Sequence, residues 1–292
     1  MRAPETTPVG YEHGPVTKAP NWHGLVTLDI LFNNLSTGLF LAMAVGELVE
    51  PGIFRPLAAV AYPIALILLI ADLVCLVLDL GDPSRFHHML RVWKPSSPMS
   101  LGTWVLSGYS GPLTVLTLMS LLPAETGGLE WLRRLLLVVG SALALGAAVY
   151  KGVLFSTTAQ PGWRDARWLG SYLANSALVL GAAELLFLAI AKGKPEAVSL
   201  LRHALMFLLV LNLVVLALVL ADVRAALARA RAIRLLAAIA AVVFLGGLLA
   251  PLGLLALGTS VPMVGAVVLI VVGALVVRSE IVQLPHLLSH GA

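Results

Sequence analysis

The sequence predicts an all-α polytopic membrane protein with eight transmembrane helices, and two observations carry this prediction. Of its 292 residues, 59% are hydrophobic and only 12% are charged, whereas about a quarter of the residues in a soluble domain are charged. Long uncharged windows recur along the chain, and about 20 apolar residues are enough for a helix to cross a hydrocarbon core roughly 30 Å thick. The short alternating segments of a membrane β-barrel do not occur in the sequence.

Eight segments qualify as spans, separated by Pro, Gly or charged residues. They are expected at about 27–48, 56–80, 101–122, 135–156, 168–190, 200–222, 233–257 and 260–277. Taken in chain order they predict two four-helix bundles, over 26–158 and 159–280, with an N-terminal tail (1–25) and a C-terminal tail (281–292). The N-terminal tail contains four Pro and no apolar core of a signal peptide.

The two halves of the chain are alike in one stretch. The segments ADLVCLVLDLGD (71–82) and LNLVVLALVLAD (211–222) match at six positions, including the final Asp. This match favours an internal duplication with parallel repeats, because an even number of helices separates the two copies. Chance similarity between two Leu- and Val-rich helices explains the match equally well, so both interpretations stay open.

Acidic residues inside the predicted spans are costly in hydrocarbon and are therefore functional candidates. Asp29 lies a few residues inside the first span, and Asp72 and Asp79 share one face of the second span because they are seven residues apart. Asp82 precedes Pro83, and a turn or helix-cap role explains it as well as a functional role does. The candidates for a proton path are Asp72, Glu184 and Asp222.

The order of the spans brings several polar residues to one face of the first bundle, where spans one and three begin and spans two and four end. These residues are His23, Asp29, Asp79, Asp82 and Tyr150. Acids, a phenol and an imidazole together can hold a quinone head group, since each carbonyl oxygen needs a hydrogen-bond donor and a proton on reduction. Haem is not expected, because the sequence lacks two histidines facing each other at membrane depth. The single cysteine, Cys75, excludes an all-Cys iron–sulfur cluster within the chain.

Two motifs resemble a known family. The run LDLGDPSRFHHMLRVWKPSSPMSLGTW (78–104) resembles the signature between helices two and three of the NrfD/polysulfide reductase membrane-subunit family, in which an acidic DLGxP.R helix end leads into xxSPMSxGxW. YKGVLFS (150–156) is similar to the Tyr-(Thr/Ser)-Gly-hydrophobic-Leu pattern that ends helix four in that family. Arg278, near the end of the last span, also fits, and the resemblance extends over about residues 22–280.

The resemblance implies a haem-free, quinone-reactive membrane anchor that uses menaquinone or ubiquinone. It implies an iron–sulfur partner subunit and, through that partner, a catalytic subunit that contains molybdopterin. Tyr150 would hydrogen-bond the quinone. Polysulfide reductase has an Asn and a His early in its first helix, where this chain has Val26 and Asp29. The expected proton-handling group is therefore Asp29, or His23 reaching in from the start of the helix.

The connection between spans two and three would then cap the quinone pocket and present the docking face for the partner. Its basic and histidine residues suit an acidic, ferredoxin-like surface: Arg85, His87, His88, Arg91 and Lys94. The alternative is a loop whose positive charge determines membrane topology alone.

Charge also predicts the orientation of the chain. Thirteen of its 19 Lys and Arg residues fall on the face shared by both termini, so the positive-inside rule places both termini in the cytoplasm, with the chain in the plasma (inner) membrane. The basic loops are expected to contact membrane lipids and not nucleic acid. A secondary transporter or ion-translocating module is the alternative function, although the predicted helices lack the mid-membrane breaks of transporter sites.

Overall fold

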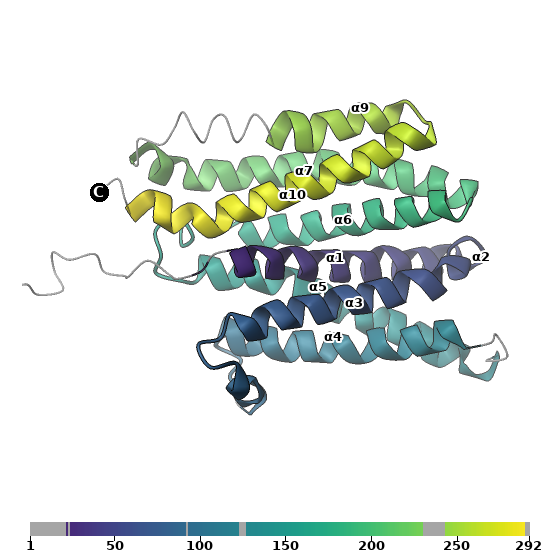
Figure 1. The fold of residues 1–292 in the computed structure, drawn as a ribbon, viewed down its shortest axis with the longest axis horizontal. Coiled ribbons are helices and arrows are strands. Elements are labelled where there is room, and N and C mark those ends of the chain that lie inside the picture. Colours follow the sequence, from purple (N-terminus) through teal and green to yellow (C-terminus); the bar gives the residue numbers. More distant parts are fainter. Residues whose placement is uncertain (1–21, 23, 92, 123–126, 230–242, 290–292) are drawn as a thin grey trace, which may run out of the picture.

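The computed structural model describes residues 22, 24–91, 93–122, 127–229 and 243–289, and within these ranges the chain is helical and contains no strand (Figure 1). The α-helices are α1 Gly24–Val49, α2 Pro51–Phe54, α3 Ala58–Leu78, α4 Pro98–Leu121, α5 Glu130–Ser156, α6 Leu169–Ala191, α7 Pro195–Arg229, α9 Ala250–Ala256 and α10 Ser260–Ser289. The short helices are η1 Arg55–Leu57, η2 Pro83–Leu90, η3 Gly127–Leu129 and the π-helical segment η4 Leu245–Leu249. The prediction of an all-α chain is confirmed for this part of the protein.

Six helical stretches in the described ranges are long and apolar enough to cross a membrane: Gly24–Val49, Pro51–Leu78, Glu130–Ser156, Leu169–Ala191, Pro195–Ala225 and Ser260–His286. They support a multi-pass membrane protein. α4 is also long, at 24 residues, but its Gly, Ser and Thr residues make it less apolar than these six. The span expected at 233–257 begins outside the described residues, so the count of eight spans stays a prediction. α10 continues past the expected end of its span and is helical through Ser289.

The long helices run roughly antiparallel, so their ends gather at two faces. α1, α4 and α6 begin at the face where α3, α5, α7 and α10 end, on the left of Figure 1. We call this the N face, because α1 begins there, and we call the other end the opposite face. α1 packs against α3, α5, α6 and α10, and α6 packs against α5, α7 and α10. α1 and α6 therefore form the centre of the described fold, while the division into two four-helix bundles stays a prediction.

Glycines allow α1 and α6 to approach closely. A Cβ atom added at Gly38 would lie 1.9 Å from the carbonyl oxygen of Ala177, and one added at Gly181 would lie 1.9 Å from the carbonyl carbon of Gly38. Small residues at such crossings let the backbones of membrane helices touch. This crossing brings the polar residues of α1 within reach of those on α6 and α10.

Aromatic rings tie the start of α1 to the connection between α5 and α6 at the N face. Trp22 stacks on Trp163 with ring centroids 5.3 Å apart, and Phe155 lies 4.5 Å from Trp163. The indole Nε1 of Trp163 donates a hydrogen bond of 2.6 Å to the carbonyl oxygen of Ile281 on α10. The N face is thus joined across α1, α5 and α10 close to the polar residues described next.

Candidate functional site

A buried cluster of three charged side chains lies among α1, α3 and α5 towards the N face. Lys151 Nζ lies 2.7 Å from Asp72 Oδ1 and 2.8 Å from Asp29 Oδ1, and it donates to the backbone oxygen of Asp29 at 3.1 Å. The exposed fractions of the three side chains lie between 0% and 8%. Burying charge is costly unless the charges are paired. With all three groups ionised, two acids and one base leave one negative charge in excess.

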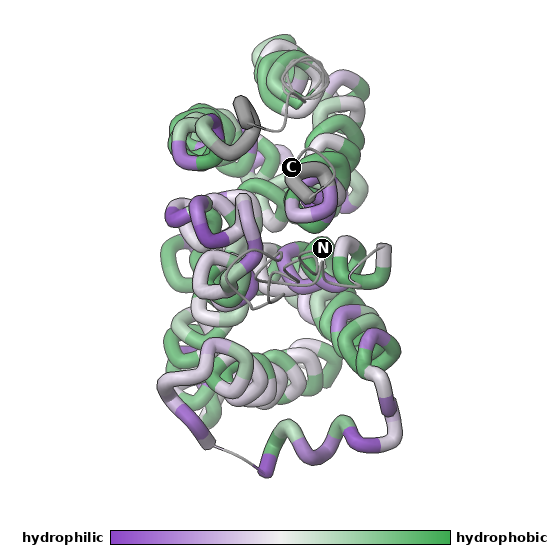
Figure 2. The backbone as a smooth tube through the Cα atoms, turned by 90° about the vertical axis from the view of Figure 1, so that its left-hand side faces the viewer, coloured by the Kyte–Doolittle hydropathy of each residue, from purple (hydrophilic) through white to green (hydrophobic). Residues whose placement is uncertain are grey.

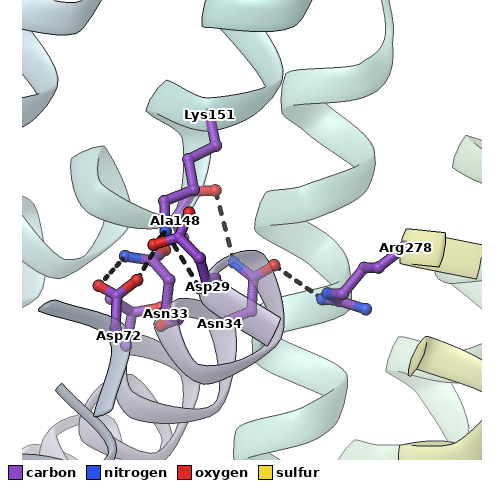
Figure 3. Close-up of polar contacts among 8 residues, drawn as sticks. Asp29, Asn33, Asn34, Asp72, Ala148, Lys151 and Arg278 are labelled. Atoms are coloured by element: carbon purple, nitrogen blue, oxygen red, sulfur yellow. Dashed lines mark hydrogen bonds and ion pairs between the residues drawn. The ribbon is translucent and has the colours of Figure 1, made fainter. Parts of the chain in front are cut away.

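Asn33 and Asn34 extend this cluster on both sides of α1 (Figure 3). Asn33 Nδ2 donates a hydrogen bond of 3.1 Å to Asp72 Oδ2. Asn34 lies between the Ala148 carbonyl, to which it donates at 3.5 Å, and Arg278, whose Nη2 donates to its Oδ1 at 2.7 Å. One pair of neighbouring asparagines thus connects α3 and α5 to α10.

Arg278 is a buried cation, and no ion pair with an acid is found for it in the described part of the chain. Its side chain is fully buried and donates to Asn34 Oδ1, to Ser176 Oγ at 3.1 Å and to the carbonyl of Ala274 at 3.0 Å. When all three of its groups are ionised, the Asp29–Lys151–Asp72 cluster has a net charge of opposite sign to that of Arg278. Asn34 joins the two through its amide.

Tyr150 lies beside the cluster, and a glycine of the first motif explains how its ring fits there. A Cβ atom at Gly102 would lie 2.1 Å from Cδ2 of the Tyr150 ring, so Gly102 leaves the space that the ring occupies. The centre of that ring is 5.7 Å from Lys151 Nζ. A Cβ atom at Gly152 would lie 2.5 Å from the Cα of Gly170, which sets a close contact between α5 and α6. The motifs at 96–104 and 150–156 thus meet in space.

The SPMS part of the first motif forms the start of α4. Ser97 is the N-cap residue, and its Oγ accepts a hydrogen bond of 3.5 Å from the backbone N–H of Ser100. Ser100 Oγ in turn accepts from the backbone N–H of Lys94 at 3.1 Å. Pro98 follows the cap at the first helical position, where its missing N–H is not needed. These contacts hold the end of the preceding loop against α4.

The structure brings together only some of the residues predicted for the quinone site. Asp29 and Tyr150 lie in or beside the buried cluster, whereas Asp79 is half-buried at the end of α3. Asp82 is exposed and binds within its own loop, accepting from Ser84 Oγ at 2.5 Å and pairing with Arg85 Nε at 3.0 Å. The backbone oxygen of Asp82 also accepts from the Arg85 N–H at 3.1 Å, which is a turn contact. His23 lies outside the described residues.

The residues predicted to dock a partner lie on an exposed loop at the edge of the N face, where hydrophilic and hydrophobic positions alternate (Figure 2). The rings of His87 and His88 are 4.3 Å apart, and Arg91 Nη1 lies 3.4 Å from His88 Nδ1. Phe86 and Trp93 are 50% and 59% exposed on the same loop. The loop therefore offers basic and apolar groups side by side.

The three residues proposed for a proton path lie on three different helices, and no contact joins them within the described ranges. Asp72 is part of the buried cluster. Glu184 on α6 has a buried Oε2 without a hydrogen bond to any described residue. Asp222 accepts from Arg167 Nη2 and from the Trp168 N–H, both at 3.3 Å, and so ties the end of α7 to the start of α6.

Sequence reasoning missed the partners of the acids. Lys151 follows Tyr150 in the second motif, and a lysine in an apolar span needs an acid nearby, so a buried acid partner could have been expected for it. A second buried pair was also missed at the opposite face, where Arg133 Nε and Nη2 each donate 2.8 Å hydrogen bonds to Glu47. Tyr62 donates to the same carboxylate at 2.8 Å. A comparable sequence signal existed for this pair. Glu47 and Arg133 have opposite charges, and each lies within two turns of a helix end at the opposite face.

The described residues define a multi-pass helical membrane protein with a buried acid–base cluster near one face and a basic loop at the edge of that face. The polysulfide reductase family model matches residues 12–287, and the chain belongs to the NrfD/polysulfide reductase family. This confirms the resemblance drawn from the two motifs, and it indicates a membrane subunit of a redox complex that works with other subunits. A comparison with curated proteins gave no match.

Proposed function

We propose that this chain is the quinone-reactive anchor of an oxidoreductase, exchanging electrons between an iron–sulfur subunit and membrane menaquinone or ubiquinone. The catalytic subunit, which contains molybdopterin, is reached through the iron–sulfur partner. One observation carries the proposal: the buried Asp29–Lys151–Asp72 cluster lies beside Tyr150, towards the same face as the exposed basic loop. Groups that move protons and a surface that receives electrons would thus lie at one end of the molecule.

The residues present fit a quinone head group in their chemistry. The Tyr150 phenol can donate a hydrogen bond to a carbonyl oxygen. Asn33 Oδ1 is a buried acceptor without a hydrogen bond in the described part of the chain, and it suits a hydroxyl group or a water molecule. When bound, a quinone supplies chemistry that takes up two electrons and two protons, so it requires proton donors close by.

The charge of the cluster suits proton transfer. Lys151 holds Asp29 and Asp72 within 3 Å of one ammonium group, with one negative charge in excess when all three are ionised. A proton taken up by the Asp29 carboxylate cancels that excess, and a proton released from it restores the excess. Asp29 is the proposed proton-handling group, with Asp72 and Lys151 setting its electrostatic surroundings.

The loop at the edge of the N face is the proposed docking surface for the iron–sulfur partner. Arg85, Arg91 and Lys94 are exposed and suit an acidic surface, and charge complementarity of this kind steers association. The exposed rings of Phe86 and Trp93 are the aromatic groups that interface centres favour. By the positive-inside count this face is the cytoplasmic one.

Two substitutions test the site in the assembled complex. Asp29→Asn is expected to lower quinone turnover roughly 100-fold, since general acid–base groups contribute at least about that factor. Tyr150→Phe is expected to weaken quinone binding, raise KM and so lower turnover at a subsaturating quinone concentration, with subunit assembly intact. The matched controls are Asp165→Asn and Tyr62→Phe, which make the same chemical changes away from the cluster. Unchanged turnover in both site variants would overturn the site assignment.

An ion-translocating module is the second candidate, favoured by the polar contact of Asn34 with Arg278 on the far side of α1. This contact extends the buried polar residues from α3 to α10. Proton flux across liposomes containing the chain alone tests it. Flux without a partner or quinone would favour the module over the redox anchor.

A further inference from the structure

A second polar site lies at the opposite face, away from the Asp29–Lys151–Asp72 cluster. A cavity of about 430 Å³ opens there between the turn joining α6 to α7 and the start of α10. Its polar lining consists of Lys194, Ser199, Arg202 and Ser260. The family motifs do not include these residues, and the proposed redox chemistry does not use them.

Arg202, which lines the cavity, has an unmet requirement for a hydrogen-bond acceptor. Its Nε is buried and makes no hydrogen bond within the described ranges, where Arg202 also forms no ion pair. A buried donor left without an acceptor costs free energy, and most native buried donors have one. A Cβ atom at Gly258, whose φ is +75°, would lie 2.7 Å from Arg202 Nη1. The guanidinium therefore lies against the backbone of the turn before α10.

The charge around the cavity is positive. Lys194 and Arg202 line it, Lys192 lies two residues before Lys194, and Glu196 is the nearby acid in the sequence. Three bases and one acid leave a net positive charge at this end of α7. The remaining wall is apolar and includes Ile190, Val198 and Met263. A basic mouth above an apolar wall, at the end of membrane-spanning helices, matches the two halves of a phospholipid.

We propose that this cavity binds one anionic phospholipid, with Arg202 and Lys194 holding the phosphate and the apolar wall contacting the first acyl carbons. The surroundings favour a lipid over a soluble anion, because the neighbouring helix surface is apolar and open. Leu200 is 47% exposed on α7, and Val261 is 84% exposed at the start of α10. The site is independent of the proposed quinone chemistry.

Native mass spectrometry of the protein extracted in mild detergent tests retention of the lipid. The wild-type chain is expected to carry one tightly held phospholipid, and Lys194→Gln combined with Arg202→Gln is expected to weaken retention roughly 30-fold, which corresponds to about 1 kcal/mol for each of the two basic residues. Lys192→Gln removes one nearby charge from outside the cavity and is expected to weaken retention far less than the double variant. Equal retention by the double variant would overturn the proposal.

A thermal titration distinguishes the possible ligands. Delipidated protein is melted with phosphatidylglycerol, with phosphatidylcholine or with inorganic phosphate. Phosphatidylglycerol alone is expected to raise the Tm of the wild type, and not that of the double variant. An equal rise in Tm with inorganic phosphate would show that the ligand is a soluble anion and would overturn the lipid proposal. An equal rise with phosphatidylcholine would overturn the proposed preference for an anionic head group.

Ser199→Phe gives a test that leaves both charges in place. Ser199 lines the cavity, and a phenyl ring at this position would occupy part of its space. This variant is expected to lose the bound phospholipid and to keep the quinone turnover of the complex. Retention of the lipid by Ser199→Phe would show that the lipid binds elsewhere, and the proposal would then be wrong even if the double variant fails to fold.

Discussion

The single ammonium group of Lys151 links side chains from three helices. Asp29 comes from α1, Asp72 from α3 and Lys151 itself from α5, and none of the three side chains is more than 8% exposed. In hydrocarbon such groups are tolerated only as partners of one another. The acids therefore depend on the lysine for stability, whatever they contribute to proton transfer.

Replacing Lys151 by Met is expected to destabilise the fold. The substitution leaves the carboxylates of Asp29 and Asp72 buried without a cation, and breaking a buried pair in this way costs about 3–5 kcal/mol. A thermal unfolding curve in detergent measures the loss as a lower Tm. Lys192→Met, at an exposed position, is the matched control. An unchanged Tm for Lys151→Met would show that the cluster contributes nothing to stability.

Gly102→Ala is expected to disturb Tyr150 without removing any polar group. The added Cβ would lie 2.1 Å from the ring of Tyr150, so the ring must move. Quinone turnover of the complex is expected to fall by an amount similar to that of Tyr150→Phe. Gly111→Ala changes the same helix where the added Cβ meets nothing within 4 Å, and it is expected to leave turnover unaltered. Normal turnover for Gly102→Ala would show that the site does not need a glycine at this position.

At the scale of the helices, α1 presents its asparagines to α3, α5 and α10, and α6 repeats one of these contacts. Asn33 Nδ2 donates to Asp72 Oδ2 between α1 and α3, and Asn175 Nδ2 donates to Asn212 Oδ1 between α6 and α7, both at 3.1 Å. Asp72 and Asn212 are aligned in the matching segments 71–82 and 211–222. The repeated contact favours internal duplication over chance similarity.

The crossing of α1 and α6 makes its own prediction. Gly38→Ala and Gly181→Ala each place a Cβ within 2 Å of backbone atoms that cannot move aside. Each is expected to separate the helices and lower the Tm, although Ala is the better helix former by about 1 kcal/mol. Gly265→Ala, whose Cβ would meet Leu254 at an ordinary 3.6 Å, is the control. A higher Tm for Gly38→Ala would contradict the close crossing.

For the whole molecule, the sequence predicted the features that depend on local composition. The length and apolarity of each segment predicted the helices, and the alternation of helices predicted that Asp29 and Tyr150 would lie at the same end. The pairing of Lys151 with Asp72 could not be predicted, because it depends on how each helix is rotated about its axis. The contact between Arg278 and Asn34 spans 244 residues and depends on the packing of α10 against α1.

The central claim is that this chain carries electrons between an iron–sulfur subunit and quinone. Mass spectrometry of the protein extracted gently from its native membrane, recording polypeptides and bound lipid-soluble molecules together, tests it most directly. We expect an iron–sulfur protein in the complex and about one quinone per chain, with the quinone lost from Tyr150→Phe and retained in Tyr62→Phe. A stable chain that carries neither partner nor quinone would contradict it.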